Sequence, residues 1–125
     1  MDASQRQMEA SLFGKWGAEI VHFGWTAIPN ALLRNMGVLG ISPTEMVIIC
    51  HLNRFWWEKD RLPFPSILKM ADEMGVSSKT IERNLSSLEK KGLIIKIERS
   101  GKSNSYDMTP LVEKLRLAIV NDETS

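Results

Sequence analysis

The stretch 63–106 constrains the fold of this 125-residue chain more than any other part of the sequence. Its apolar residues recur at helical spacing in two short runs, PFPSILKMADEMG and VSSKTIERNLSSLEKKG. In the next run, LIIKIER, they follow a period of two, which is typical of a strand with one buried face. The turn-forming run SGKSN and the run SYDMT come after it. The stretch therefore predicts two short helices joined by a tight turn and followed by a β-hairpin.

Local signals place the ends of the two predicted helices. Pro65 suits the first turn of the first helix, and Gly75 suits the left-handed position that ends it. Ser77 is a good N-cap for the second helix, and Gly92 ends that helix. The apolar residues at helical spacing are Ile67, Leu68, Met70, Ala71 and Met74 in the first helix and Ile81, Leu85 and Leu88 in the second.

This order of elements is the layout of a winged helix-turn-helix, a module whose usual partner is double-stranded DNA. A recognition helix needs short polar groups near its N-terminus, so that the backbone can approach the major groove, and longer donors that reach bases or phosphates. On the second helix and its cap, the predicted DNA-binding residues are Ser77, Ser78, Lys79, Thr80, Arg83, Ser87 and Lys90. The alternative interpretation is an ordinary solvated helix face.

Two of these residues have distinct expected roles. Arg83 can present a bidentate pair of donors to guanine, whereas Lys79 is expected to contact a phosphate.

The predicted hairpin resembles a wing, with Leu93, Ile95 and Ile97 on its buried face and a tip at 100–104. Its predicted DNA-binding residues, which would touch the flanking backbone or minor groove, are Lys96, Arg99 and Lys102. The alternative is a solubilising loop. Residues 77–103 contain seven Lys or Arg and three Glu, a net charge of +4 against +1 for the whole chain. The basic excess therefore lies where a phosphate backbone would lie.

Length and composition predict one domain over residues 1–125, with an N-terminal extension at 1–22, a core at 23–109 and a C-terminal helix at 110–120. No apolar run is long enough to span a membrane, and the N-terminus lacks the pattern of a secretory signal. The single cysteine, Cys50, is expected to be a small buried hydrophobe. These features predict a cytoplasmic protein.

Helical patterns also occur outside the central stretch. A weak helix is expected over 2–16, with Phe13 and Trp16 docked on the domain or on a second copy, followed by extended chain over 21–27 and a helix over 29–35. Ser42 and Glu45 form a capping-box pattern that opens a largely apolar helix over 43–57. Pro110 begins a last amphipathic helix, whose apolar face is expected to pack on the N-terminal segment or a second subunit.

No catalytic, metal or cofactor motif is found, so the chain is not expected to be an enzyme. His22 and His51 are far apart in the sequence and have no metal-like partner at close spacing, and one cysteine cannot supply a zinc cluster. The Gly-Lys-Ser run at 101–103 lacks the upstream glycine and the strand-to-helix context of a phosphate loop. A solvated helix face explains the carboxylates of Asp72 and Glu73.

Two groups of residues carry a resemblance to known families. The first looks like the winged helix-turn-helix of bacterial, phage and plasmid DNA-binding proteins, in Phe64-Pro65-Ser66, Met70-Ala71, Met74-Gly75-Val76-Ser77, Lys79-Thr80-Ile81, Arg83, Leu85, Leu88-Glu89 and Lys91-Gly92-Leu93-Ile94. The second is similar to the N-terminal domain of the primosomal protein DnaD and to plasmid replication initiators, in Ile28-Pro29-Asn30-Ala31-Leu32-Leu33, Leu39-Gly40-Ile41-Ser42, Glu45, His51-Leu52-Asn53-Arg54-Phe55 and Tyr106-Asp107-Met108-Thr109-Pro110-Leu111.

The resemblance implies a mainly α fold with a small β-hairpin, a winged helix-turn-helix with extra N- and C-terminal helices, and a role in DNA binding or replication assembly. The chain is not expected to carry the second, helical domain of DnaD, and Lys79, Thr80 and Arg83 look more like a sequence reader. The expected function is therefore sequence-specific binding of double-stranded DNA by a homodimer or higher oligomer that regulates transcription or starts replication or transfer of a mobile element, such as a plasmid. The alternative is a protein-interaction and oligomerisation module of a replication assembly. Replication or transfer proteins are further expected partners.

Overall fold

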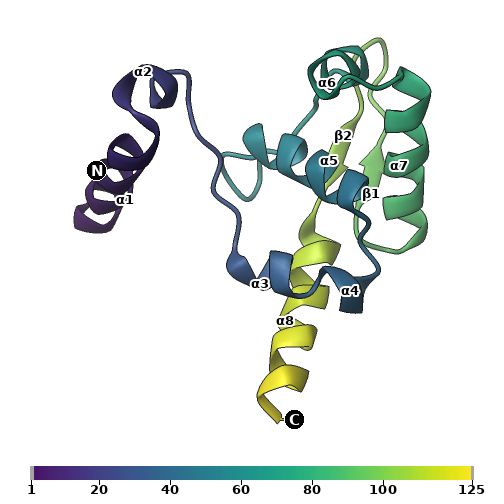
Figure 1. Ribbon diagram of the computed structural model, residues 1–125. Coiled ribbons are helices and arrows are strands. Elements are labelled where there is room, and N and C mark those ends of the chain that lie inside the picture. Colours follow the sequence, from purple (N-terminus) through teal and green to yellow (C-terminus); the bar gives the residue numbers. More distant parts are fainter. Residues whose placement is uncertain (1, 125) are drawn as a thin grey trace.

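Helices make up most of the structure, and its two strands form a single hairpin (Figure 1). The computed structural model describes residues 2–124. In chain order, the elements in this range are α1 (Ala3–Trp16), α2 (Ala18–Val21), α3 (Asn30–Arg34), α4 (Met36–Leu39), α5 (Pro43–Arg54), α6 (Ile67–Met74), α7 (Ser78–Lys90), β1 (Ile95–Ile97), β2 (Ser105–Asp107) and α8 (Thr109–Thr124). The architecture is the predicted winged helix-turn-helix with additional helices at both ends.

The helix-turn-helix is built by α6, a short turn and α7. Gly75 ends α6 with a φ of 68°, in the left-handed region that glycine adopts without steric cost. The Ser77 hydroxyl then accepts a hydrogen bond from the Thr80 backbone N–H at 3.1 Å and so caps α7. Both signals act as the sequence predicts.

The predicted start of α6 differs slightly from the structure. Ser66, rather than a residue before Pro65, takes the N-cap position, and its hydroxyl accepts from the Lys69 N–H at 3.2 Å. Leu68 is 74% exposed, because it lies at the edge of the face that buries Met70 and Ala71 rather than at its centre.

The core lies where α5, α6 and α7 meet. Ile48 and Leu52 of α5, Met70 of α6 and Ile81 and Leu88 of α7 are almost completely buried. Both α5 and α6 pack against α7, so the inner face of α7 is held from two directions. The position of the outer face of α7 is therefore fixed by the core.

A buried ion pair joins the beginning of α5 to the end of α7. Ser42 and Glu45 form the predicted capping box, and Lys91 Nζ donates to Glu45 Oε1 at 2.6 Å and to the Gly40 carbonyl oxygen at 2.5 Å. Burial raises the pKa of Glu45, but hydrogen bonds from Lys91, Ser42 and Ser87 outweigh that effect and leave the pKa below its ordinary value. Glu45 is therefore ionised and holds α7 in place at neutral pH.

The hairpin corrects one prediction about its buried face. Leu93 and Ile94 are both buried, whereas Ile95 and Ile97 are 51% and 41% exposed. The antiparallel pairing of β1 with β2 extends over only three residues of each strand, and within the described part of the chain β1 pairs with no other strand. The Tyr106 N–H instead donates to the Pro63 carbonyl oxygen at 2.9 Å, so the inner strand is β2 and the edge strand is β1.

Helix α5 ends earlier than predicted, at Arg54 rather than near Trp57. The chain turns there because it must return to pair Pro63 with β2, and the Trp56 indole N–H donates to the Lys59 carbonyl oxygen across the new loop at 3.3 Å. Trp57 is left 83% exposed. Arg54 Nη1 pairs with Glu73 Oε1 at 3.0 Å and ties the end of α5 to α6.

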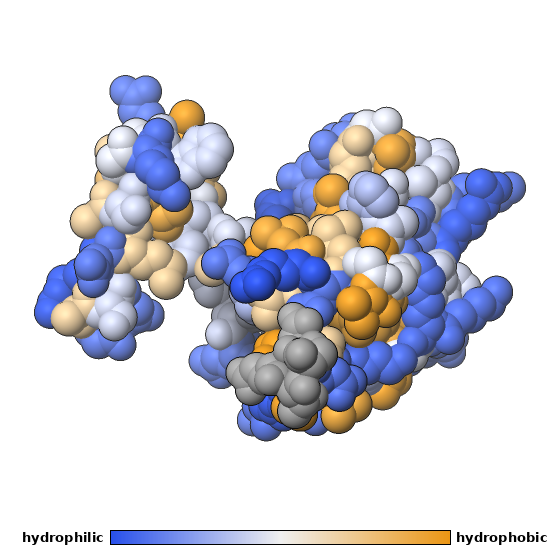
Figure 2. All heavy atoms as spheres, turned by 60° about the horizontal axis from the view of Figure 1, so that its bottom comes forward, coloured by the Kyte–Doolittle hydropathy of each residue, from blue (hydrophilic) through white to orange (hydrophobic). Residues whose placement is uncertain are grey.

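The N-terminal arm, defined as residues 2–23, stands beside the body of the molecule (Figure 2). It contains α1 and α2, and α1 buries none of its residues. Extended chain was predicted from residue 21, but Val21 belongs to α2, because Gly17 ends α1 and a second helical turn follows it directly. The expected docking of Phe13 and Trp16 does not occur within the chain, since Trp16 is 61% exposed.

The last helix, α8, packs on α3 rather than on the N-terminal arm. Leu111 and Leu115 are buried there, and the Asp107 side chain accepts from the Thr109 N–H at 2.9 Å at the start of the helix. Within the described range, no helix combines the length and the apolar character that crossing a membrane requires.

Candidate nucleic-acid interface

The outer side of α7 carries an uninterrupted polar stripe. At 3.6 residues per turn, Lys79, Arg83, Ser86 and Lys90 share the side opposite the buried residues of this helix. All four are exposed. The three cations make no side-chain hydrogen bond or ion pair with any described residue, so their charges are available to a partner.

The hydroxyls along one flank of the stripe already make hydrogen bonds within the structure. The hydroxyls of Ser77 and Thr80 lie 3.0 Å apart and hydrogen-bond to each other at the cap of α7. Ser87 is half-buried. Burial raises the pKa of Glu45, and hydrogen bonds from Lys91, Ser42 and Ser87 lower it. Ser78, which lies on the opposite flank, is also half-buried. Among the predicted contacts, Ser77, Thr80 and Ser87 therefore have hydrogen bonds within the structure that Lys79, Arg83 and Lys90 lack.

The other flank is acidic and faces the hairpin. Burial raises the pKa of Tyr106 on β2, a hydrogen bond with Asn104 lowers it, and the charges of Glu89 and Glu82 raise it further. The two carboxylates therefore lie within electrostatic range of β2. Glu82 and Glu89 contribute to the net charge of residues 77–103, but their position relative to β2 depends on how the hairpin folds back beside α7, which the sequence does not specify.

The predicted cations of the hairpin differ in how free they are. Lys96 Nζ lies 3.9 Å from Glu98 Oε1, which is a long contact between exposed groups. The Arg99 guanidinium lies over the Phe64 ring, 4.6 Å from its centroid, and so is held near the loop that precedes α6. Lys102, at the hairpin tip, is exposed and makes no side-chain contact of this kind with a described residue.

Residues 39–94 match a family model described as a helix-turn-helix domain. The match supports a helix-turn-helix fold with DNA as its partner. It covers α5, α6 and α7 together with the buried Leu93 and Ile94, and it ends before the hairpin. The more specific resemblance to DnaD and to replication initiators is not supported by this match, which is to the general helix-turn-helix class. A comparison with curated proteins found no match.

Outside α7 and the hairpin, whether a side chain could bind a metal or act as a base or nucleophile depends on its grouping with other side chains and on its pKa shift. The described residues include no group of three or more His, Cys, Asp or Glu that could hold a metal ion. Burial lowers the pKa of His51 and the charge of Arg54 lowers it further, while Glu73 raises it, so this imidazole is neutral at pH 7. Burial raises the pKa of the Cys50 thiol, which disfavours the reactive thiolate.

Proposed function

We propose that the protein is a sequence-specific double-stranded DNA-binding protein without catalytic activity, and that it acts as a dimer to regulate transcription or to start replication or transfer of a mobile element. The observation that carries the proposal is the stripe of Lys79, Arg83 and Lys90, which lies opposite the core on a capped helix and has no partner among residues 2–124. A helix in this arrangement can enter the major groove while its scaffold stays fixed.

Arg83 is the residue proposed to read sequence. It lies in the second turn of α7, close to the N-terminal end that recognition helices direct at base edges. Its guanidinium can donate two hydrogen bonds to O6 and N7 of guanine. Lys79, one turn earlier, and Lys90, at the far end, are proposed to hold phosphates on either side.

Selection of bound duplexes from a random pool tests this proposal most directly. Wild-type protein is expected to enrich one motif, and a dimer would enrich an inverted or direct repeat whose half-sites are about one helical turn, ~34 Å, apart. Replacing Arg83 with Ala should relax the preference at one guanine and weaken binding to the selected site by about 1–3 kcal/mol. Arg34→Ala, which removes an exposed arginine from α3, is the matched control and should bind as the wild type does.

The hairpin has a separate signature in the same assay. Replacing Lys102 with Ala should weaken binding about equally at all sequences and reduce the slope of log K against log[salt] by about 1. Enrichment of the same motif with the same affinity by Arg83→Ala and Lys102→Ala proteins would refute these assignments.

A second candidate function is that of a protein-interaction module in a replication or transfer assembly. The exposed N-terminal arm favours it, because α1 buries no residue and presents Phe13 and Trp16 to the surroundings. The two candidates differ in one measurement: absence of salt-dependent duplex binding at micromolar protein would favour the interaction module.

A further inference from the structure

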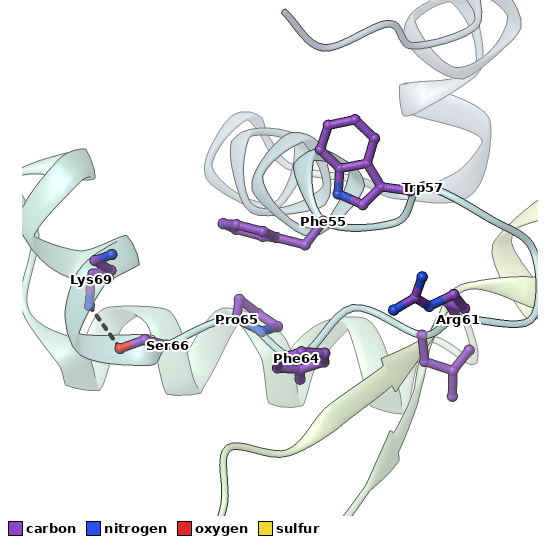
Figure 3. A pocket seen from close by; sticks show the side chains of 8 residues that line it. Phe55, Trp57, Arg61, Phe64, Pro65, Ser66 and Lys69 are labelled. Atoms are coloured by element: carbon purple, nitrogen blue, oxygen red, sulfur yellow. Dashed lines mark hydrogen bonds between the residues drawn. The ribbon is translucent and has the colours of Figure 1, made fainter. Parts of the chain in front are cut away.

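A second surface with its own chemistry lies in the chain segment that joins α5 to α6. A hollow of about 570 Å³ opens there, and three exposed aromatic rings line it: Phe55, Trp57 and Phe64 (Figure 3). In Figure 3, Phe55 and Trp57 lie on one side of the hollow, and Phe64 and Pro65 lie on the other. A ligand inside it would therefore meet ring faces or edges from two directions.

Two cations stand at opposite ends of this hollow in Figure 3. They are Arg61, from the loop before the hollow, and Lys69, from the first turn of α6. Neither forms an ion pair with a described carboxylate, and none of the eight lining residues is acidic. Arg99 of the hairpin adds a third positive charge against the Phe64 ring. The hollow is therefore both aromatic and positively charged.

This combination selects a narrow class of ligand. An exposed cluster of large aromatic side chains marks a binding surface, and cations around it favour a negatively charged partner. Of these cations, Lys69 also lies within electrostatic range of Glu73, without forming an ion pair with it. Single-stranded nucleic acid meets both conditions, because it joins flat aromatic bases by phosphates, and proteins bind it with ring platforms inside basic grooves. A duplex meets only the second condition, since its bases are stacked on one another. The volume lies in the range of ~300–1,000 Å³ that suits small ligands, which fits individual bases.

We propose that the hollow binds single-stranded nucleic acid, with an unpaired base stacked on Trp57 or Phe64 and the adjoining phosphates held by Arg61 and Lys69. The site is distinct from the stripe on α7, since none of its lining residues belongs to that helix. The inference goes beyond duplex recognition and does not depend on it.

Fluorescence anisotropy of a labelled short oligothymidine, titrated with the full chain, tests the proposal. Wild-type protein should bind it with an affinity that falls as salt rises, and Trp57→Ala should bind about tenfold more weakly because one stacked base is lost. Trp57→Phe keeps a ring and should recover most of the affinity. Trp16→Ala, which removes an exposed indole from α1, is the matched control and should bind as the wild type does.

The charge contribution has a different readout. Arg61→Gln and Lys69→Gln should each reduce the slope of log K against log[salt] by about 0.7, the value for one phosphate of a single strand. Lys59→Gln removes a cation from the same loop that does not line the hollow, and should leave the slope unchanged.

The two sites can fail independently. Arg83→Ala should weaken duplex binding and keep oligothymidine binding, whereas Trp57→Ala should do the reverse. Oligothymidine affinity that is unchanged in both Trp57→Ala and Phe64→Ala would overturn the proposal. The proposal would also be overturned by a second result. In that result the wild type does not bind oligothymidine, and sedimentation equilibrium shows that Trp57→Ala and Phe64→Ala shift from dimer to monomer. A second copy of the chain would then cover the hollow.

Discussion

At the scale of single residues, Glu45 and Lys91 show how a buried charge is kept ionised. The Glu45 carboxylate is 2% exposed, and its Oε1 accepts from Lys91 while the Ser42 backbone also donates to it. Removing one partner of a buried ion pair leaves the other charge desolvated and unpaired, which lowers the free energy of unfolding strongly. Replacing both partners with apolar residues changes it much less. The end of α7, and therefore Lys90 on its outer stripe, depends on this contact.

We expect Lys91→Met to lower the free energy of unfolding at pH 7 by about 3 kcal/mol, the lower end of the range for such pairs because Lys91 is partly exposed. Lys90→Met, on the neighbouring exposed residue, should change it by less than about 0.5 kcal/mol. Urea titrations of the two variants measure both values. Equal effects of the two substitutions would mean that the buried pair does not hold α7.

The same pair predicts a pH dependence. The folded-state pKa of Glu45 lies below its ordinary value of 4.5, so the stabilisation is fully present above that ordinary value and is lost as pH falls through the lowered pKa. Wild-type stability should therefore drop in that acidic window, and the drop should be smaller in Glu45→Gln. Thermal unfolding of both proteins as a function of pH measures the difference. An identical acid limb in the two proteins would contradict the lowered pKa.

At the scale of elements, the N-cap of α7 allows the contribution of Ser77 to stability to be tested separately from its proposed contribution to DNA binding. Ser77 was predicted both to cap the helix and to bind DNA, and its hydroxyl is engaged with the Thr80 N–H and hydroxyl. A carboxylate at this position can accept the same backbone hydrogen bond, but it would repel a nearby phosphate.

We expect Ser77→Ala to lower the free energy of unfolding by about 1 kcal/mol, whereas Ser77→Asp should keep most of the stability. Ser86→Ala, on the exposed side of the same helix, should be nearly neutral. Denaturant titration gives the stabilities, and duplex titration shows whether Ser77 also lies near phosphate. If Ser77→Asp binds duplex as tightly as the wild type, Ser77 is a cap and not a contact.

At the scale of the whole molecule, the N-terminal arm is the part whose position is not fixed by packing against the hydrophobic core. It faces the end of α5 across a hollow of about 510 Å³, with Gln5 and Glu9 on one wall and Trp56 and Trp57 on the other. Because α1 buries no residue, its apolar side chains contribute little to folding in this arrangement. An arm of this kind can be stabilised by a second copy.

Deletion of residues 2–16 should change the free energy of unfolding of the remaining chain by less than about 0.5 kcal/mol, since no buried contact is lost. If the arm carries the proposed dimer, the same deletion should convert it to a monomer. Sedimentation equilibrium and urea titration of the two lengths measure these outcomes. A truncated protein that remains dimeric would place the dimer contact elsewhere.

Residues whose roles are local could be predicted from the sequence. Ser42, Gly75 and Ser77 act at helix ends, where one side chain or one backbone angle decides the structure, and all three lie as expected. The general helix-turn-helix class followed from them. Features that depend on distant contacts could not be predicted: the early end of α5 depends on Pro63 meeting β2, and the exposure of Ile95 depends on what covers β1.

The candidate site followed the same rule. The outer positions of Lys79 and Arg83 follow from helical spacing, which the sequence contains. The acidic flank and the engagement of Arg99 with Phe64 depend on where the hairpin lies, and no local pattern specifies that. The hollow beside Trp57 also arises from the loop after α5, whose course no local sequence pattern specifies.

If α7 enters a groove as proposed, its acidic flank restricts the direction from which a duplex can approach. A duplex tilted toward the hairpin would bring its phosphates against Glu82 and Glu89, whereas one tilted toward α5 would meet the hydroxyls of Thr80 and Ser87. Repulsion on one side only would favour a single docking angle, whereas attraction to Lys79, Arg83 and Lys90 alone would not distinguish between angles. In a complex, the angle between the axis of α7 and the groove would then depend on the carboxylates that repel phosphate as much as on the cations that bind it.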